Sequence, residues 1–176
     1  MENIADKNKN NTVRMLVEQG AVLEAGQLLG HAFFLEGFVV EGNRIGRTLG
    51  YPTANLGRLD ESQTTPAQGV YVALVKAVDR WHESMVNIGI RPTLDLDHVT
   101  IEAHLFDFDE DLYGQKISIH FLERIRDEMR FPSLGDLKDQ LRKDRTTSLQ
   151  ILGELAFQPQ PDEERVIIKK IPSETK

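Results

Sequence analysis

The sequence contains no cysteine among its 176 residues, and this absence removes several classes of site. Without thiols, the chain has no disulfide framework, no thiolate zinc site and no cysteine nucleophile. A chain without disulfides suits a reducing compartment, so we expect a cytoplasmic location. No apolar run approaches the ~18 residues that a membrane helix needs. The polar residues 1–11 also lack the apolar core of a signal peptide, so we expect neither a membrane partner nor a secretory leader.

Positive charge is scarce as well. The chain carries 21 Lys and Arg residues against 28 Asp and Glu residues, which gives a net charge of −7. Proteins that bind the phosphate backbone of nucleic acids rely on positive surface, so we expect no nucleic-acid partner. A small anionic ligand held by a local loop is still compatible with this charge. The length indicates one domain with room for a short appendage.

Short strands dominate the middle of the chain. Strand-like composition or alternation marks five segments: 32–42, 69–79, 81–90, 99–109 and 116–126. Gly, Pro and Asp turns join these segments, and no β-α-β alternation is present. The pattern therefore indicates a mainly β fold, an antiparallel barrel or sandwich rather than a Rossmann-like domain.

Helical patterns flank the strands. Two short helical stretches end at Gly20 and Gly30, and the first is expected to begin after a frayed polar stretch of residues 1–11. Another helix is expected after the strands, where Ser133 and Asp136 form a variant capping box.

These patterns divide the chain into three parts. We expect a helical appendage over 1–30, a barrel with its C-terminal helix over 31–155, and a tail over 156–176. The tail segment 166–171 is compatible with either an edge strand or disorder.

A glycine-rich stretch follows the first strand. Gly42, Gly46 and Gly50 recur every four residues, with Arg44 and Arg47 between them. Glycines let a ligand approach backbone amides closely, and clusters of such amides bind phosphate. The spacing matches neither a Walker A loop nor GxGxxG. A long surface loop with turn glycines explains the same pattern.

The next four residues read Pro-Thr-Ala-Asn. Pro52 biases Tyr51 to an extended backbone, and in an extended segment Thr53 and Asn55 point to the same side. A hydroxyl and an amide oxygen beside a phosphate-binding loop would suit Mg²⁺. The alternative is an ordinary Asx or Thr turn at a strand end.

The segment 99–109 carries two titratable side chains on its polar face. Glu102 and His104 alternate with apolar residues that belong to the core. A carboxylate there is either a solvated surface group or a general base, and we name Glu102 as the candidate base. For His104 we expect a structural role.

Two further turns present residues to a possible ligand. Residues 111–114 form a hairpin corner, or an apolar lip made by Leu112 and Tyr113. Arg126 and Glu128 share a face if their segment is extended, although such charge runs are usually solvated.

Taken together, these segments resemble riboflavin kinase. The blocks that carry the resemblance are, in order, GFVVEGNRIGRTLGYPTANL, GVYVALV, VNIGIRPT, IEAHLFDFDEDLYG, ISIHFLERIRDEMRF and LKDQLRKD. They cover most of residues 30–144. The likeness is strongest to the kinase modules of bacterial bifunctional riboflavin kinase/FAD synthetases.

The resemblance implies a six-stranded antiparallel Greek-key barrel with a C-terminal helix. It implies that ATP phosphorylates the 5′-hydroxyl of riboflavin to give FMN, with Mg²⁺ or another divalent cation. By match to the family motif, Glu102 would be the catalytic base, and Thr53 and Asn55 would hold the metal and the phosphates. The remaining roles would fall to a phosphate-covering loop with Gly42, Gly46, Arg47 and Gly50, and to a flavin border with Leu112, Tyr113, Arg126 and Glu128.

One feature of the bifunctional enzymes is missing. They carry an N-terminal adenylyltransferase with a histidine-rich motif, and none of the five histidines here lies in such a context. We therefore expect no FAD synthesis from this chain, although an adenylyltransferase domain in a longer parent chain is compatible with the sequence. A flavin-binding or regulatory barrel without turnover, and an FMN-dependent oxidoreductase, are the alternatives. The intact Thr53, Asn55 and Glu102 argue against loss of turnover.

Overall fold

A computed structural model describes residues 4–58, 60, 62–92, 97–159 and 165–170 of the chain. The helices are α1 (Ile4–Glu18), α2 (Val22–Leu29), α3 (Ile45–Leu49) and α4 (Leu134–Glu154). The strands are β1 (Phe33–Val40), β2 (Ala54–Arg58), β3 (Gly69–Ala77), β4 (Arg80–Pro92), β5 (Asp97–Leu105), β6 (Lys116–Arg126), β7 (Leu155–Pro159) and β8 (Val166–Lys170).

Strands β1 to β6 form a closed barrel in the order β1-β2-β5-β4-β3-β6. All six neighbouring pairs are antiparallel. Strands β3, β4 and β5 follow one another as neighbours, and β2 lies beside β5, which is a Greek-key arrangement. The predicted six-stranded antiparallel barrel is confirmed, and β2 is the strand that the sequence marked only as an extended segment.

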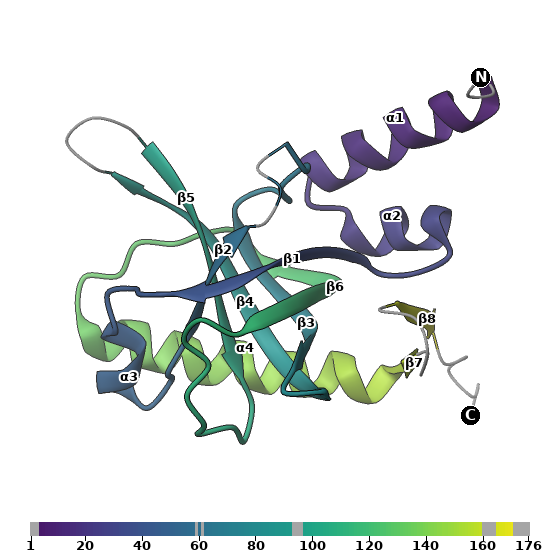
Figure 1. Ribbon diagram of the computed structural model, residues 1–176. Helices are drawn as coiled ribbons and strands as arrows, with labels where there is room; N and C mark the ends of the chain where they lie inside the picture. Colours follow the sequence, from purple (N-terminus) through teal and green to yellow (C-terminus); the bar gives the residue numbers. More distant parts are fainter. Residues whose placement is uncertain (1–3, 59, 61, 93–96, 160–164, 171–176) are drawn as a thin grey trace, which may run out of the picture.

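The barrel interior is filled by residues that alternate along each strand. On β5, Ile101, Ala103 and Leu105 are buried in this core, so the residues between them face outward. The packed helices α1 and α2 extend the core with Val17 and Val22, which are fully or almost fully buried. Figure 1 shows these two helices beside one end of the barrel.

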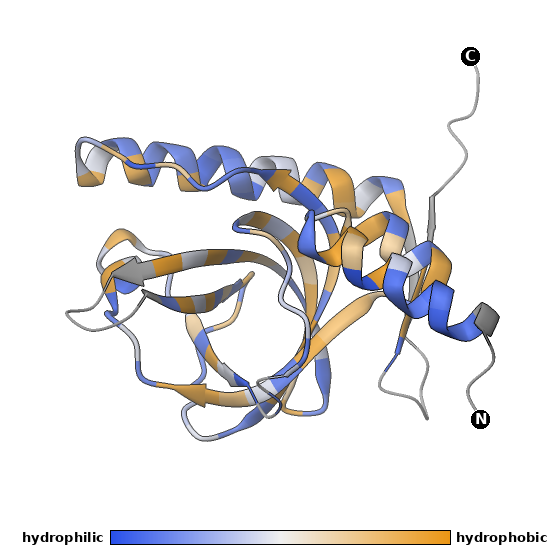
Figure 2. Cartoon of the chain, turned by 90° about the horizontal axis from the view of Figure 1, so that it is seen from above, coloured by the Kyte–Doolittle hydropathy of each residue, from blue (hydrophilic) through white to orange (hydrophobic). Residues whose placement is uncertain are grey.

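Helix α4 runs along the outside of the barrel (Figure 1, Figure 2). Its first turn is capped by Ser133, whose side chain accepts a hydrogen bond from the backbone N–H of Asp136 at 3.2 Å, as the sequence predicted. Its inner face packs on a second apolar cluster, to which Leu152 contributes from the last turn and Met85 from β4. The chain from Leu134 to Glu154 is one continuous helix because burial of Ser148 and Leu152 holds its second half on the barrel.

In three segments the structure differs from what the sequence predicted or shows which of two predicted alternatives is present. The polar stretch expected to be frayed is helical from Ile4 onward, since it continues the helix that Val13 and Val17 anchor. The glycine-rich stretch is not all loop: it contains α3. The tail forms strands, with β7 paired to β8, and Ala32 donates a backbone hydrogen bond to Val166 at 2.7 Å.

Candidate active site

Three polar side chains form a row across the outer face of the barrel. Asn55 on β2 lies opposite Glu102 on β5, and Glu102 lies opposite Asn87 on β4. Residues directly opposite each other in antiparallel strands share a face. Because the neighbours Ile101 and Ala103 fill the core, this row points outward.

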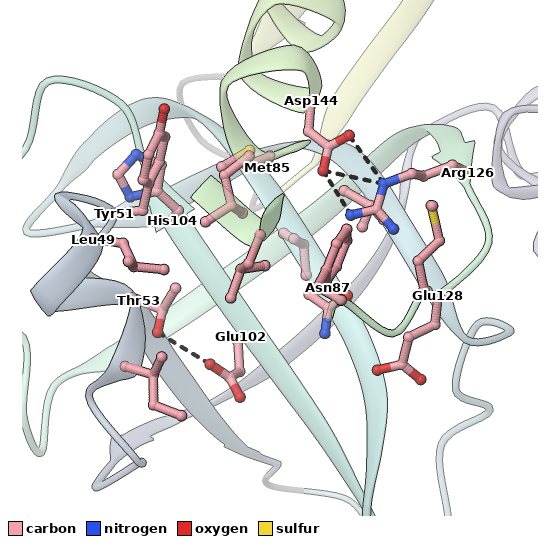
Figure 3. A pocket seen from close by; sticks show the side chains of 18 of the residues that line it. Leu49, Tyr51, Thr53, Met85, Asn87, Glu102, His104, Arg126, Glu128 and Asp144 are labelled. Atoms are coloured by element: carbon pink, nitrogen blue, oxygen red, sulfur yellow. Dashed lines mark hydrogen bonds and ion pairs between the residues drawn. The ribbon is translucent and has the colours of Figure 1, made fainter. Parts of the chain in front are cut away.

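Thr53 joins this row from the residue before β2. Its hydroxyl donates a hydrogen bond to Oε2 of Glu102 at 3.2 Å (Figure 3). Both side chains are partly buried, so the contact is shielded from bulk water. A hydroxyl, an amide and a carboxylate are thus brought together by the register of β2 and β5.

A cavity of about 320 Å³ opens beside Thr53 and Glu102. It lies between the outer face of the barrel, α3 and α4. Its apolar wall is formed by Ile45, Leu49, Val70, Met85, Val86, Met129, Phe131, Leu137 and Leu141. Its polar lining includes Asn43, Thr53, Asn87, Glu102, His104, Arg126, Glu128 and Asp144. A mostly apolar cleft of this size with a few convergent polar groups is typical of a small-molecule site.

His104 supports the segment that carries Thr53. Its Nδ1–H donates to the carbonyl oxygen of Pro52 at 2.8 Å, and Tyr51 contacts the imidazole edge to face at 5.2 Å. Burial lowers the pKa of His104, and the Pro52 carbonyl only partly offsets this effect. A neutral imidazole with its proton on Nδ1 therefore fixes the backbone next to Thr53. The structural role expected for His104 fits this contact.

The glycine-rich stretch lies against the same site. At Gly42 a Cβ atom would come within 2.1 Å of the Asn55 side chain, and at Gly46 within 2.2 Å of the Tyr51 carbonyl oxygen. At Gly46 the contact is with backbone, so only glycine permits this approach, whereas a side chain at Gly42 would displace the side chain of Asn55. Gly50 ends α3 with a φ of 85°. Gly46 lines the cavity, whereas Arg47 is exposed and is not part of its lining.

The structure does not bring the predicted Leu112 and Tyr113 lip to this cavity. Leu112 is only 6% exposed and belongs to the barrel core. The turn is tied to β1, because Gly114 donates a backbone hydrogen bond to Val39 at 2.9 Å. Tyr113 is exposed and packs under the guanidinium of Arg44, 5.5 Å from its ring centre.

Arg126 and Glu128 both line the cavity, but the guanidinium of Arg126 is already paired with a carboxylate of the same chain. That carboxylate belongs to Asp144 of α4, with an Nη2–Oδ2 distance of 2.7 Å. Glu128 lies over Gly89 on β4, where a Cβ atom would be 2.2 Å from its carboxylate oxygen. The role of either residue toward a flavin stays a prediction.

Sequence reasoning missed Asn87 and Asp144 as cavity residues. Asn87 lies beside Glu102 because of the pairing register of β4 and β5. A single sequence does not reveal this register. For Asp144 the sequence offers one weak sign, an acidic residue on the inner face of the expected helix, four residues after Gln140. In the structure Gln140 donates a hydrogen bond to it.

The oxygen atoms gathered around Glu102 are suitable ligands for a divalent metal ion. Within the described parts of the chain, no group of three or more His, Asp or Glu side chains could hold a metal by itself. Mg²⁺ is commonly held by one or two protein oxygens together with substrate phosphates and water. The hydroxyl of Thr53, the amide of Asn55 and the carboxylate of Glu102 are hard oxygen donors on one face, so they fit such an ion.

The barrel and its outer cleft define a small-ligand site in which a carboxylate is held by a hydroxyl. Comparison with known proteins gives the family. The flavokinase family, described as riboflavin kinase, matches residues 29–152. The chain therefore belongs to the riboflavin kinase family, as the sequence motifs predicted.

Two bacterial relatives show how much of a bifunctional enzyme this chain matches. The bifunctional riboflavin kinase/FMN adenylyltransferase of Bacillus subtilis is 33% identical over 161 residues, covering 88% of this chain and 51% of that protein. Its counterpart in Escherichia coli K12 is 37% identical over 145 residues, covering 82% of this chain and 46% of that protein. The chain thus spans about half the length of these relatives, and it matches their kinase half.

Solved structures agree on the fold. A crystal structure described as a macrolide-efflux protein from Streptococcus pneumoniae superposes with a TM-score of 0.76 at 39% identity, covering 85% of this chain and 49% of that chain. The riboflavin kinase of Trypanosoma brucei gives a TM-score of 0.50 at 27% identity, covering 70% of this chain and 82% of that chain. In the part of the chain that is described, no helix is long and apolar enough to cross a membrane.

Proposed function

We propose that this chain transfers the γ-phosphoryl group of ATP to the 5′-hydroxyl of riboflavin, giving FMN and ADP. The observation that carries the proposal is the hydrogen bond from Thr53 to Glu102 at the edge of the apolar cleft. The candidate base thus lies beside the segment with the family motif and at an apolar cleft, and this arrangement supports the proposal. Membership of the riboflavin kinase family supports the same reaction.

Glu102 is the proposed general base. In the reaction, the ribityl oxygen forms a bond to the γ-phosphorus while the bond to the bridging β,γ oxygen breaks and ADP leaves. Glu102 accepts the proton of the attacking hydroxyl. The hydrogen bond from Thr53 orients the carboxylate, which lies at the boundary between the cleft and the Thr53–Asn55 segment. Phosphoryl transfer needs mainly this kind of positioning and charge stabilisation from a protein.

Thr53 and Asn55 are the proposed ligands of Mg²⁺ and the nucleotide phosphates. A bound divalent ion would supply neutralisation of the phosphate charge. The segment from Gly42 to Gly50, with Gly46 and Arg47, is proposed to cover the phosphates. Its proximity to Asn55 supports this placement, since Gly42 packs on that side chain.

The apolar cleft is the proposed flavin site. Met85, Phe131 and Leu141 offer a wall against which a planar ring can pack, and Glu128 adds a polar group at its border. Arg126 belongs to the same wall. Leu112 and Tyr113 do not line the cleft, so the cavity gives no support to their predicted contact with the flavin.

Three features of the whole protein are part of the proposal. The chain does not make FAD by itself, because it matches the kinase half of its relatives, and an adenylyltransferase domain in a longer parent chain is a compatible arrangement. A cytoplasmic location is part of the proposal, supported by the absence of cysteine. We expect no nucleic-acid partner.

The test is FMN formation from riboflavin, ATP and Mg²⁺. Lumiflavin, which has the ring but no ribityl hydroxyl, is the matched control and should consume no ATP. Tight riboflavin binding without FMN would instead indicate the alternative function, a flavin-binding barrel without turnover.

A further inference from the structure

The carboxylate of Asp144 is almost completely enclosed between α4 and the barrel. Asp144 is 1% exposed. Nε of Arg126 donates to Oδ1 at 3.0 Å and to Oδ2 at 3.1 Å, and Nη2 donates to Oδ2 at 2.7 Å. Nε2 of Gln140 donates to Oδ1 at 2.8 Å. The oxygens of Asp144 are thus engaged within the protein, although the residue belongs to the cavity lining.

Arg126 connects Asp144 to one wall of the cleft. It is the last residue of β6, and the residues 127–132 that follow, here termed the wall segment, form neither helix nor strand. Nη1 of Arg126 donates to the carbonyl oxygen of Asp127 at 2.9 Å. The guanidinium also lies 5.9 Å from the ring centre of Phe131. One side chain therefore contacts both ends of the wall segment.

The wall segment supplies several groups to the cleft. Glu128, Met129 and Phe131 all line it. The carboxylate of Glu128 lies over Gly89 of β4, where a Cβ atom would be 2.2 Å from its oxygen, so the position of the segment decides where this charge stands relative to β4. In Figure 3 the Arg126–Asp144 pair and Glu128 lie on one side of the cavity, and Thr53 and Glu102 lie on the other.

We propose that Asp144 is a positioning residue that, through Arg126, holds the wall segment in place and so sets the affinity for riboflavin. This inference rests on the proposed riboflavin kinase function. Asp144 is buried and Arg126 is half-buried, with side-chain exposures of 2% and 17%. Without the carboxylate the half-buried guanidinium has no counter-charge, so it turns toward water. Its contacts with Asp127 and Phe131 are then lost. The Thr53–Glu102 side of the cavity does not depend on these contacts, so nucleotide binding is unaffected.

The experiment compares Asp144→Asn with Asp139→Asn. Asp139 lies on the same helix and pairs with Arg142 at 3.2 Å, but both side chains of that pair are about two-thirds exposed, at 66% and 67%. Exposed pairs of this kind contribute little, so Asp139→Asn is the matched control. Amide hydrogen exchange, riboflavin binding by flavin fluorescence, and the KM values for riboflavin and ATP are measured for each variant.

For Asp144→Asn we expect faster exchange confined to residues 126–133 and riboflavin affinity weakened by about tenfold, the scale of one lost charge-assisted contact. The KM for ATP and kcat at saturating riboflavin stay near the wild-type values. Asp139→Asn behaves as wild type. If Asp144→Asn does not fold, Gln140→Leu removes one supporting hydrogen bond without leaving a charge unpaired, and should show the same pattern more weakly.

Two results overturn the proposal. One is unchanged exchange in the wall segment together with unchanged riboflavin affinity. The other is faster exchange throughout the barrel with equal losses in riboflavin and ATP binding, which would make Asp144 a general stability residue. Failure of the proposed function is seen separately, as a wild-type chain that binds riboflavin but forms no FMN, because exchange and binding are measured without turnover.

Discussion

Glu102 sits among residues that a single sequence would assign to an ordinary amphipathic strand. Its neighbours Ile101 and Ala103 enter the core, and Glu102 itself faces outward toward Thr53. Glu102→Gln keeps the shape of the side chain but removes its ability to take a proton. We expect kcat to fall by ~10²–10⁴-fold, the usual contribution of general-base catalysis.

The same variant should bind riboflavin and ATP·Mg²⁺ normally and keep its melting temperature. Steady-state kinetics, binding titrations and a thermal melt check this. A kcat close to the wild-type value would return Glu102 to the role of a solvated surface group. A large drop in melting temperature would make it structural.

Thr53 and Asn55 lie on the same face as Glu102, so their removal should affect turnover more than folding. Thr53→Ala and Asn55→Ala each remove one oxygen donor from the proposed metal site. We expect a higher Mg²⁺ concentration for half-maximal rate in both variants, with little change in melting temperature. Thr146→Ala is the control, because Thr146 is exposed on α4 and its hydroxyl donates to the carbonyl oxygen of Arg142 in the same helix. Normal rates at limiting Mg²⁺ in both variants contradict the metal assignment.

His120 gives the fold a pH dependence. Burial lowers the pKa of His120 from its usual 6.5 to about 3, and the nearby His31 acts in the same direction. Between these values the unfolded chain binds a proton that the folded chain does not. The contribution of His120 to stability is therefore complete above pH 6.5 and is lost as the pH falls toward 3.

The His120→Gln variant tests this dependence. Burial also lowers the pKa of His82 and His104, so the comparison must be made with one histidine changed at a time. Denaturant unfolding at pH 7.5 and pH 5 should show a smaller loss of unfolding free energy for His120→Gln than for wild type. Equal losses in the two proteins would contradict the assignment.

At the scale of elements, the strands were predictable where apolar and polar residues alternate. The segment 116–126 coincides with β6, and the other predicted strands shift by a few residues at their ends. Strand β2 carried no such alternation, and its place between β1 and β5 comes from pairing with distant strands. Helix α3 was missed because it is only five residues long and begins after Arg44 in a left-handed conformation, which local preference disfavours.

In the candidate site too, residues in local motifs could be named from the sequence, whereas contacts between distant segments could not. Thr53, Asn55 and Glu102 were named from local motifs, and β2–β5 pairing brings them together. Their roles stay predictions. Leu112 was placed in a ligand-binding lip because the pattern of a turn does not show which side chain enters the core. Asp144 could not be assigned, since its partner Arg126 is distant in sequence.

The cap of α4 offers a prediction about stability. The hydroxyl of Ser133 accepts a hydrogen bond from the Asp136 amide at the start of the helix. Ser133→Ala should lower the free energy of unfolding by about 1 kcal/mol. Denaturant unfolding measures this, with Thr146→Ala as a non-capping control on the same helix. No loss would mean that packing on the barrel alone fixes the start of α4.

For the whole molecule, the barrel places all the proposed reacting groups on its outer surface, between helices that come from different parts of the chain. The apolar interior fixes strand register, and this register aligns Asn55, Glu102 and Asn87. The chain spans about half the length of its bifunctional relatives. We therefore expect kinase activity without adenylyltransferase activity from the chain alone.

The most direct test of the account is the product formed from riboflavin, ATP and Mg²⁺ by the purified chain, separated by chromatography. We predict FMN that accumulates with time, no FAD even after FMN and ATP are supplied together, and almost no FMN from Glu102→Gln under the same conditions. FAD formation would contradict the restriction to the kinase reaction. An absence of FMN from the wild-type chain, in a preparation that melts cooperatively, would contradict the central claim.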